Sequence, residues 1–143
     1  MMWRSAAVAL VGLTLTTAIA SAQDAKGTWL TEGGRSRIRI TDCGGTLCGA
    51  IIWLREPNDP TTGKPRTDKS NADASKRTRP LIGVQTVLSM KASGAGKWIG
   101  QLYNPEDGKT YSGSAVLQNA NALKVEGCVA SVFCKSQTWT RVN

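Results

Sequence analysis

Gln137-Thr138-Trp139-Thr140-Arg141-Val142, close to the end of the chain, forms a pair with Gly27-Thr28-Trp29-Leu30 near its start, and this pair sets the architecture. Both stretches read as short strands, the last and the first of the chain. In a closed up-and-down barrel the first and last strands are neighbours. An arginine there can lie across an indole face, a contact worth about 0.5–2 kcal/mol. We therefore predict that Arg141 stacks on Trp29 where the barrel closes.

Turn signals divide the chain into about eight predicted strands, with no convincing helix outside the N-terminal leader. Arg35–Asp42 alternates strictly, with three arginines (Arg35, Arg37, Arg39) on one face and isoleucines on the other. Leu47–Leu54 is almost continuously apolar, which predicts cover on both sides. Leu81–Met90 is expected to turn Ile82, Val84, Leu88 and Met90 to one side. The remaining strands are expected at Trp98–Tyr103, Lys109–Gln118, Leu123–Cys128 and Cys134–Val142.

Five predicted strands contain an interior glycine: Gly49, Gly83, Gly100, Gly113 and Gly127. Glycine weakens a flat strand but is tolerated where a sheet bends sharply. Closure also removes the edge strands that would invite aggregation. The fold class predicted is therefore all-β: a small, closed or nearly closed, antiparallel up-and-down barrel.

Residues 1–22 have the pattern of a cleaved secretory signal peptide. Arg4 precedes the apolar run from Ala6 to Ala20, and Ala20-Ser21-Ala22 matches a signal-peptidase site. The run is short for a bilayer span of about 20 residues, and no later segment is apolar enough to be an anchor. We expect residues 23–143 to form a single domain that is periplasmic or secreted by a bacterium.

The exported part of the chain is strongly basic. Loss of Arg4 from the 18 lysines and arginines leaves 17 against 10 acidic residues, a net charge of +7. Such a protein meets anionic lipids, cell-wall polymers or acidic ligands, although positive charge also simply maintains solubility. No nucleic-acid partner is expected, because the compartment holds little nucleic acid.

Four cysteines fall in the exported part: Cys43, Cys48, Cys128 and Cys134. Thiols outside the cytoplasm are usually oxidised, and four cysteines allow three pairings. We favour Cys43–Cys48 and Cys128–Cys134, each closing a short loop, over a four-thiolate zinc site.

The segment Arg55–Pro80 breaks the strand pattern, with four prolines and no periodicity. Long connections of this kind are usually functional lids or mobile segments. Its seven basic and four acidic residues suggest either a basic flap over the barrel mouth or a solvated loop of mixed charge.

The residues present support little catalytic chemistry. The chain contains no histidine, which removes histidine-based triads and metal sites. Asp68 and Asp73 are expected to be solvated carboxylates, because a raised pKa needs burial or a close like charge. We predict a protein that is not an enzyme and that uses no cofactor or metal.

Gly27-x-Trp29 with the late Arg141 resembles the lipocalins and their calycin relatives, which bind small apolar ligands. Three further stretches, Gly49–Leu54, Tyr103–Tyr111 and Gln137–Val142, together with Asp68…Asn71, resemble a family of exported bacterial proteins catalogued as domain of unknown function 2147. This resemblance covers nearly the whole exported part. It implies a lipocalin-like barrel and a location in the periplasm, and it assigns no activity.

Two functions remain. The first is a binding module for one small apolar or amphipathic molecule, whose anionic end the basic flap would hold. The alternative is an envelope protein whose basic strand face and flap bind a polyanion or a protein partner. The tryptophans of the strands either line a pocket or, more often in small barrels, fill the core. The side chains expected to contact a ligand or partner are Trp53, Asp68, Asn71, Arg77, Trp98 and Tyr111.

Overall fold

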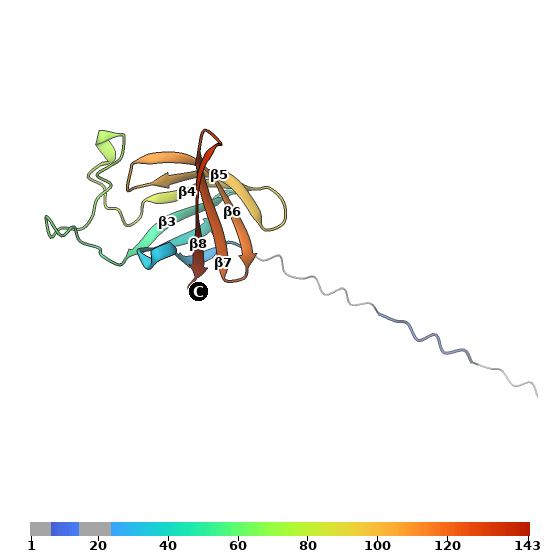
Figure 1. Ribbon diagram of the computed structural model, residues 1–143. Coiled ribbons are helices and arrows are strands. Elements are labelled where there is room, and N and C mark those ends of the chain that lie inside the picture. The colour runs from blue at the N-terminus through green and yellow to red at the C-terminus, as the bar shows by residue number, and fades with distance from the viewer. Residues whose placement is uncertain (1–6, 15–23) are drawn as a thin grey trace, which may run out of the picture.

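Eight antiparallel strands form a closed barrel in which each strand pairs with its neighbour in sequence and β1 pairs with β8 (Figure 1). The computed structural model describes residues 7–14 and 24–143. Two short 3-10 turns, η1 (Glu32–Gly34) and η2 (Ala74–Lys76), lie in loops. The strands are β1 (Gly27–Leu30), β2 (Ser36–Asp42), β3 (Leu47–Leu54), β4 (Gln85–Ala92), β5 (Lys97–Asn104), β6 (Lys109–Asn119), β7 (Ala122–Val129) and β8 (Phe133–Arg141).

The closure follows the prediction from the two ends of the chain. Trp29 of β1 pairs with Arg141 of β8, and the guanidinium carbon lies 4.3 Å from the centre of the indole ring. Arg141 also donates hydrogen bonds to the carbonyl oxygens of Asp24, Lys26 and Ala120 at 2.6–2.7 Å. The indole N–H of Trp29 donates to the carbonyl of Ala25 at 2.8 Å. These contacts seal one end of the barrel, here called the closed end.

The core fills the half of the barrel nearest the closed end. Its most deeply buried apolar side chains are Trp29, Ile40, Met90 and Leu123. Three strand glycines allow the facing strands to approach there. A Cβ on Gly49, Gly100 or Gly113 would lie within 2.6–2.9 Å of a side chain or backbone atom of a neighbouring strand. Close packing in a narrow barrel therefore explains these glycines.

Two strand predictions were wrong in part. β3 is not covered on both sides, because Ile52 on its outer face is 46% exposed. The strand predicted at Leu81–Met90 begins only at Gln85. Residues 81–84 form a turn in which Gly83 has a φ of +102° and its N–H donates to the carbonyl of Ile51.

The predicted one-sided pattern of this strand was also wrong. Ile82 is 47% exposed in the turn. Within β4 the register shifts between Leu88 and Lys91, where Ser89 has a φ of +45°. This bulge lets Val87 and Met90, three residues apart, both reach the core. Period-2 alternation does not reveal a bulge of this kind.

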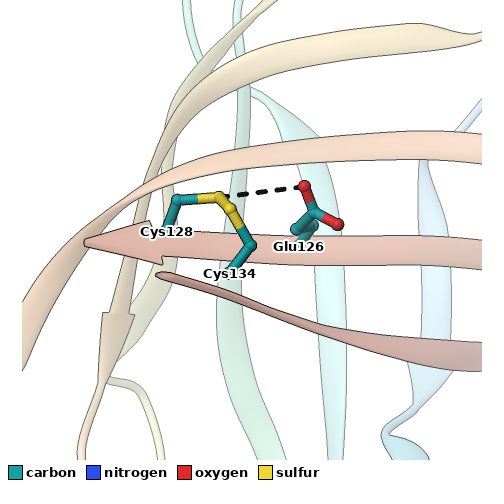
Figure 2. A group of neighbouring side chains, drawn as sticks. All are labelled: Glu126, Cys128 and Cys134. Atoms are coloured by element: carbon teal, nitrogen blue, oxygen red, sulfur yellow. Dashed lines mark hydrogen bonds between the residues drawn. A yellow bond between two sulfur atoms is a disulfide. The ribbon is translucent and has the colours of Figure 1, made fainter. Parts of the chain in front are cut away.

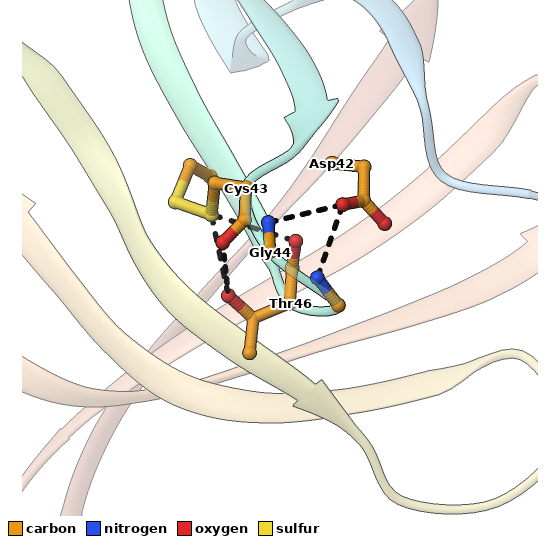
Figure 3. The surroundings of a disulfide bond; sticks show 6 residues. Asp42, Cys43, Gly44 and Thr46 are labelled. Carbon is orange, nitrogen blue, oxygen red and sulfur yellow. Dashed lines mark hydrogen bonds between the residues drawn. A yellow bond between two sulfur atoms is a disulfide. The ribbon is translucent and has the colours of Figure 1, made fainter.

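Both predicted disulfides are confirmed. Cys43–Cys48 closes the β2–β3 turn, where the carboxylate of Asp42 accepts hydrogen bonds at 3.1 Å from the N–H groups of Gly44 and Gly45 (Figure 3). Cys128 and Cys134 are directly opposed in the β7–β8 hairpin, with Cα atoms 4.1 Å apart. All four sulfurs are bonded in pairs, so no four-thiolate set exists.

The predicted signal peptide stays a prediction, since its cleavage site at Ala20–Ala22 lies outside the described residues. No helix within residues 7–14 and 24–143 is long and apolar enough to cross a membrane.

Candidate functional site

The end of the barrel opposite the closed end is hollow. A cavity of about 680 Å³ opens there, and its size is within the usual range for small-molecule sites. Ile38, Ile51 and Trp139 form apolar wall on the side of the core. The mouth is formed by the β1–β2 loop, the β5–β6 turn and the β7–β8 hairpin. The barrel is therefore solid in one half and a cup in the other.

The tip of the β7–β8 hairpin carries apolar side chains that face solvent at the mouth of the cup. Phe133 is 76% exposed, and Val129 and Val132 are also exposed. All three line the cavity. The Cys128–Cys134 disulfide ties the two strands together just below this tip (Figure 2). A ligand that entered the cup would cover part of this apolar surface.

Polar side chains line the same cavity at separate points of its wall. They include Thr86 from β4, Tyr111 from β6, and Lys135 and Gln137 from β8. The hydroxyl of Tyr111 donates a hydrogen bond to Asp107, and this bond raises the pKa of Tyr111. Gln137 accepts a hydrogen bond from the indole N–H of Trp139 at 3.0 Å. Thr86 differs from the others because its hydroxyl is buried and has no hydrogen-bond partner among the described residues.

Thr86 is 8% exposed, and its hydroxyl oxygen makes no hydrogen bond within the described part of the chain. A buried hydroxyl without a partner costs about 1–3 kcal/mol. Thr86 as a residue lines the cavity, while its hydroxyl oxygen is itself buried.

Replacing Thr86 by valine is expected to raise the free energy of unfolding of the ligand-free protein by about 1 kcal/mol, because the unpaired hydroxyl is removed without a change of shape. Urea unfolding followed by circular dichroism measures it. The matched control is Thr28→Val, because the buried hydroxyl of Thr28 accepts a hydrogen bond from Arg39 at 3.1 Å, so its loss should destabilise. Equal destabilisation by both substitutions would contradict this account of Thr86.

The segment Arg55–Pro80 lies beside the mouth and does not cover it. None of its residues is among those lining the 680 Å³ cavity. Figure 1 shows it extending to one side of the barrel between β3 and β4. Two isolated bridges, Asn58 with Pro65 and Thr67 with Pro80, give it internal order. Of the two alternatives for this segment, the structure does not show the flap over the mouth; the segment is a side loop, called here the β3–β4 loop.

Asp68 anchors the β3–β4 loop to Tyr103 of β5. Its side chain is 0% exposed, so the expectation of a solvated carboxylate was wrong. It accepts hydrogen bonds from the hydroxyl of Tyr103 at 2.5 Å, from the amide of Asn71 at 2.9 Å and from the guanidinium of Arg79 at 2.8–2.9 Å. Burial works to raise the pKa of Asp68, but these three donors outweigh it and hold the pKa below its usual value. Burial and the hydrogen bond to Asp68 together raise the pKa of Tyr103 to about 12.

An Asp68 carboxylate held in its charged form is suited to fastening a loop and unsuited to donating a proton. Asp73 is exposed and caps η2 by accepting from the N–H of Ser75. The two aspartates therefore perform structural tasks in the β3–β4 loop, and nothing in their surroundings prepares either for acid–base chemistry.

Of the six side chains expected to contact a ligand, only Tyr111 lines the cup. Trp53 lies opposite Arg37 of β2, whose guanidinium stacks over the indole at 4.6 Å. Trp98 packs against the core. Asn71 and Arg77 support the β3–β4 loop, since the Nε of Arg77 donates to the carbonyl of Asn71 at 2.7 Å.

The basic strand face predicted on β2 is divided in the structure. Arg37 stacks on Trp53, and Arg39 donates to the hydroxyl of Thr28. Arg35 precedes the strand and pairs with Glu106 at the mouth, 3.3 Å away. Arg37 and Arg39 are both exposed on β2, and of the three arginines only Arg35 pairs with a carboxylate of the described residues.

Glu126, Cys128 and Cys134 form a compact group that resembles a metal-ligand set (Figure 2). One carboxylate oxygen of Glu126 lies 3.8 Å from the sulfur of Cys128. Both sulfurs belong to one disulfide, and metal binding by cysteine needs a thiolate. Glu126 is then the only ligand left, and one carboxylate makes no metal site.

Residues 27–141 match the family model described as an uncharacterized protein conserved in bacteria (DUF2147). The chain belongs to this family. The match spans every strand of this DUF2147 barrel. Comparison with curated proteins finds no match.

A solved structure supports the fold of this DUF2147 barrel. Protein HP1028 from the human pathogen Helicobacter pylori, described as a member of the lipocalin family, superposes with a TM-score of 0.69 at 24% sequence identity. The similar region covers 84% of each chain. At this identity the likeness shows a lipocalin-like fold and nothing finer. The predicted family and fold class are confirmed, and two disulfides in a bacterial family accord with an exported protein.

Proposed function

We propose that the protein is a non-enzymatic binding module of the bacterial envelope, periplasmic or secreted, that holds one small apolar or amphipathic molecule in its cup. The observation that carries this proposal is the 680 Å³ cavity, whose wall is mainly apolar and includes a few polar side chains such as Tyr111 and Gln137. An apolar cavity with a few polar groups is the usual form of a small-molecule site. The exposed apolar hairpin tip at the mouth supports the same function.

Filling the cup tests the proposal. Gly127 lies on the cavity wall, and a Cβ there would stand 3.4 Å from the nearest atom, in Tyr111, which is ordinary contact. Gly127→Leu is therefore expected to fold and to weaken binding of the fluorescent apolar probe N-phenyl-1-naphthylamine by about tenfold or more, because the leucine occupies the space of the probe. Fluorescence titration measures the affinity.

The matched control is Ser136→Leu. Ser136 stands between the cavity-lining Lys135 and Gln137 on β8, so its side chain points to the outer face. This variant should bind the probe as the unaltered protein does. Native mass spectrometry of protein purified from its own periplasm adds an independent readout. A protein that carries no molecule and binds no probe would defeat the proposal.

Binding of a polyanion through the basic face of β2 is the alternative function. Its support is the exposure of Arg37 and Arg39, whose partners Trp53 and Thr28 are neutral.

A further inference from the structure

A second cavity adjoins the cup under the base of the β3–β4 loop. Its volume is about 340 Å³. It shares five wall residues with the cup, so the two cavities lie next to each other. The shared residues are Arg35, Ser36, Ile51, Pro105 and Glu106. A molecule that filled the cup would have this side cavity within reach.

The two cavities differ in charge. The charged residues of the cup wall are Arg35 and Lys135 against Glu32, Glu106 and Asp107. Those of the side cavity are Arg35, Arg55 and Arg66 against Glu56 and Glu106. The side cavity thus has one positive charge in excess, and the cup has one negative charge in excess. An anionic group is favoured in the side cavity and disfavoured in the cup.

The arginines of the side cavity are unevenly paired. Arg66 is held by Glu56, with its Nε donating to the backbone carbonyl at 2.7 Å and its Nη2 lying 3.5 Å from the carboxylate. Arg55 donates to the carbonyl of Gly33 at 3.0 Å and forms no ion pair with any carboxylate of the described residues. A guanidinium is well suited to bidentate recognition of a carboxylate or phosphate. The remaining N–H groups of the Arg55 guanidinium are therefore available to bind an anion.

Arg35 and Glu106 stand at the boundary, since both line both cavities. Their ion pair, 3.3 Å long, links the β1–β2 loop to the β5–β6 turn. Each side chain is 73% exposed, so the pair is hydrated and contributes little to stability. Separating it to admit another anion would therefore cost little.

We propose that the ligand is an amphipathic anion whose apolar part occupies the cup and whose acidic head enters the side cavity. There Arg35 exchanges Glu106 for the head group, and Arg55 provides the second guanidinium. The head is a carboxylate or a phosphate, which share the chemistry that arginine recognises. This inference rests on the proposed binding function and assigns the head-group site within it.

Matched single-chain amphiphiles test the assignment by displacement of N-phenyl-1-naphthylamine. Decanoate is expected to bind about tenfold more tightly than decanol, since only the head differs. In the double variant Arg35→Gln/Arg55→Gln this preference should fall to within about twofold, while decanol affinity is retained and reports that the cup is folded. Arg37→Gln, on the outer face against Trp53, is the matched control and should keep the full preference.

The Glu106→Gln variant separates a head-group site from a purely structural role of the Arg35–Glu106 ion pair. It removes the competing carboxylate, so decanoate affinity should rise severalfold while decanol affinity stays constant. Decyl phosphate distinguishes the two kinds of head: tighter binding than decanoate identifies a phosphate, and weaker binding a carboxylate. Equal binding of decanoate and decanol by the unaltered protein would overturn the head-group site and leave the cup intact. Failure of every probe to bind would defeat the proposed function itself.

Discussion

Replacing Trp29 by alanine is expected to lower the free energy of unfolding by about 4 kcal/mol, within the range for removing a large buried aromatic side chain. Trp29 is 0% exposed, so its loss leaves a cavity in the filled half of the barrel. The substitution also removes the surface on which Arg141 stacks and the hydrogen bond to the carbonyl of Ala25. Urea unfolding monitored by far-ultraviolet circular dichroism measures the change.

Trp53→Ala is the appropriate control for Trp29→Ala. It also replaces a tryptophan on which an arginine, Arg37, is stacked, but this tryptophan lies on the outer face of the barrel. Its expected cost is about 1 kcal/mol, mainly the lost cation–π contact. Trp29→Phe should fall between the two, since the ring is kept and the indole N–H is lost. Similar costs for Trp29→Ala and Trp53→Ala would refute the closure as the main source of stability.

Replacing Asp68 by alanine is expected to cost about 3 kcal/mol, because Tyr103 and Arg79 lose their shared acceptor. Asp68→Asn keeps the size and should cost less. The β3–β4 loop should also become open to trypsin under native conditions, since Asp68 fastens it to β5. Asp73→Asn is the control, because its carboxylate is exposed and asparagine caps equally well. Unchanged stability and unchanged cleavage in Asp68→Ala would disprove the anchoring role.

The same residue gives a pH dependence with a definite sign. The pKa of Asp68 is held below 3.8 in the folded protein. A carboxylate of this kind stabilises the fold fully above the pKa of the unfolded chain, and the contribution is lost as the pH falls through the folded pKa. The unaltered protein should therefore lose stability below about pH 4, and Asp68→Asn should lose less over the same interval. Parallel curves for the two proteins would contradict the linkage.

The sequence predicts the closure well because the signal lies in two regular strands at the two ends of the predicted sheet. The tryptophan near the start and the arginine near the end stand in strands that must be neighbours if the sheet closes. The short spacing of each cysteine pair likewise leaves a cross-turn disulfide as the simplest pairing. Both predictions need only strand order and turn length.

The candidate site is less accessible to such reasoning. Alternation indicates which side chains point inward but not whether they fill the interior, so the cup was not predictable from the strand pattern. Asp68 finds its partner Tyr103 across a separation of 35 residues, and no spacing rule connects a loop aspartate to a strand tyrosine. The bulge at Ser89 changed which residues of β4 face inward. Side-chain volume, long-range polar pairing and local backbone irregularity together decide the site.

Pairing of β1 with β8 makes the strand that comes last in the barrel the one that closes the sheet. Until it docks, β1 and β7 each present a row of unsatisfied backbone groups, and such rows recruit other chains. Contacts between sequence-distant segments also form slowly. The polypeptide is therefore most prone to self-association before β8 docks, and deletion of β8 would leave both edges open.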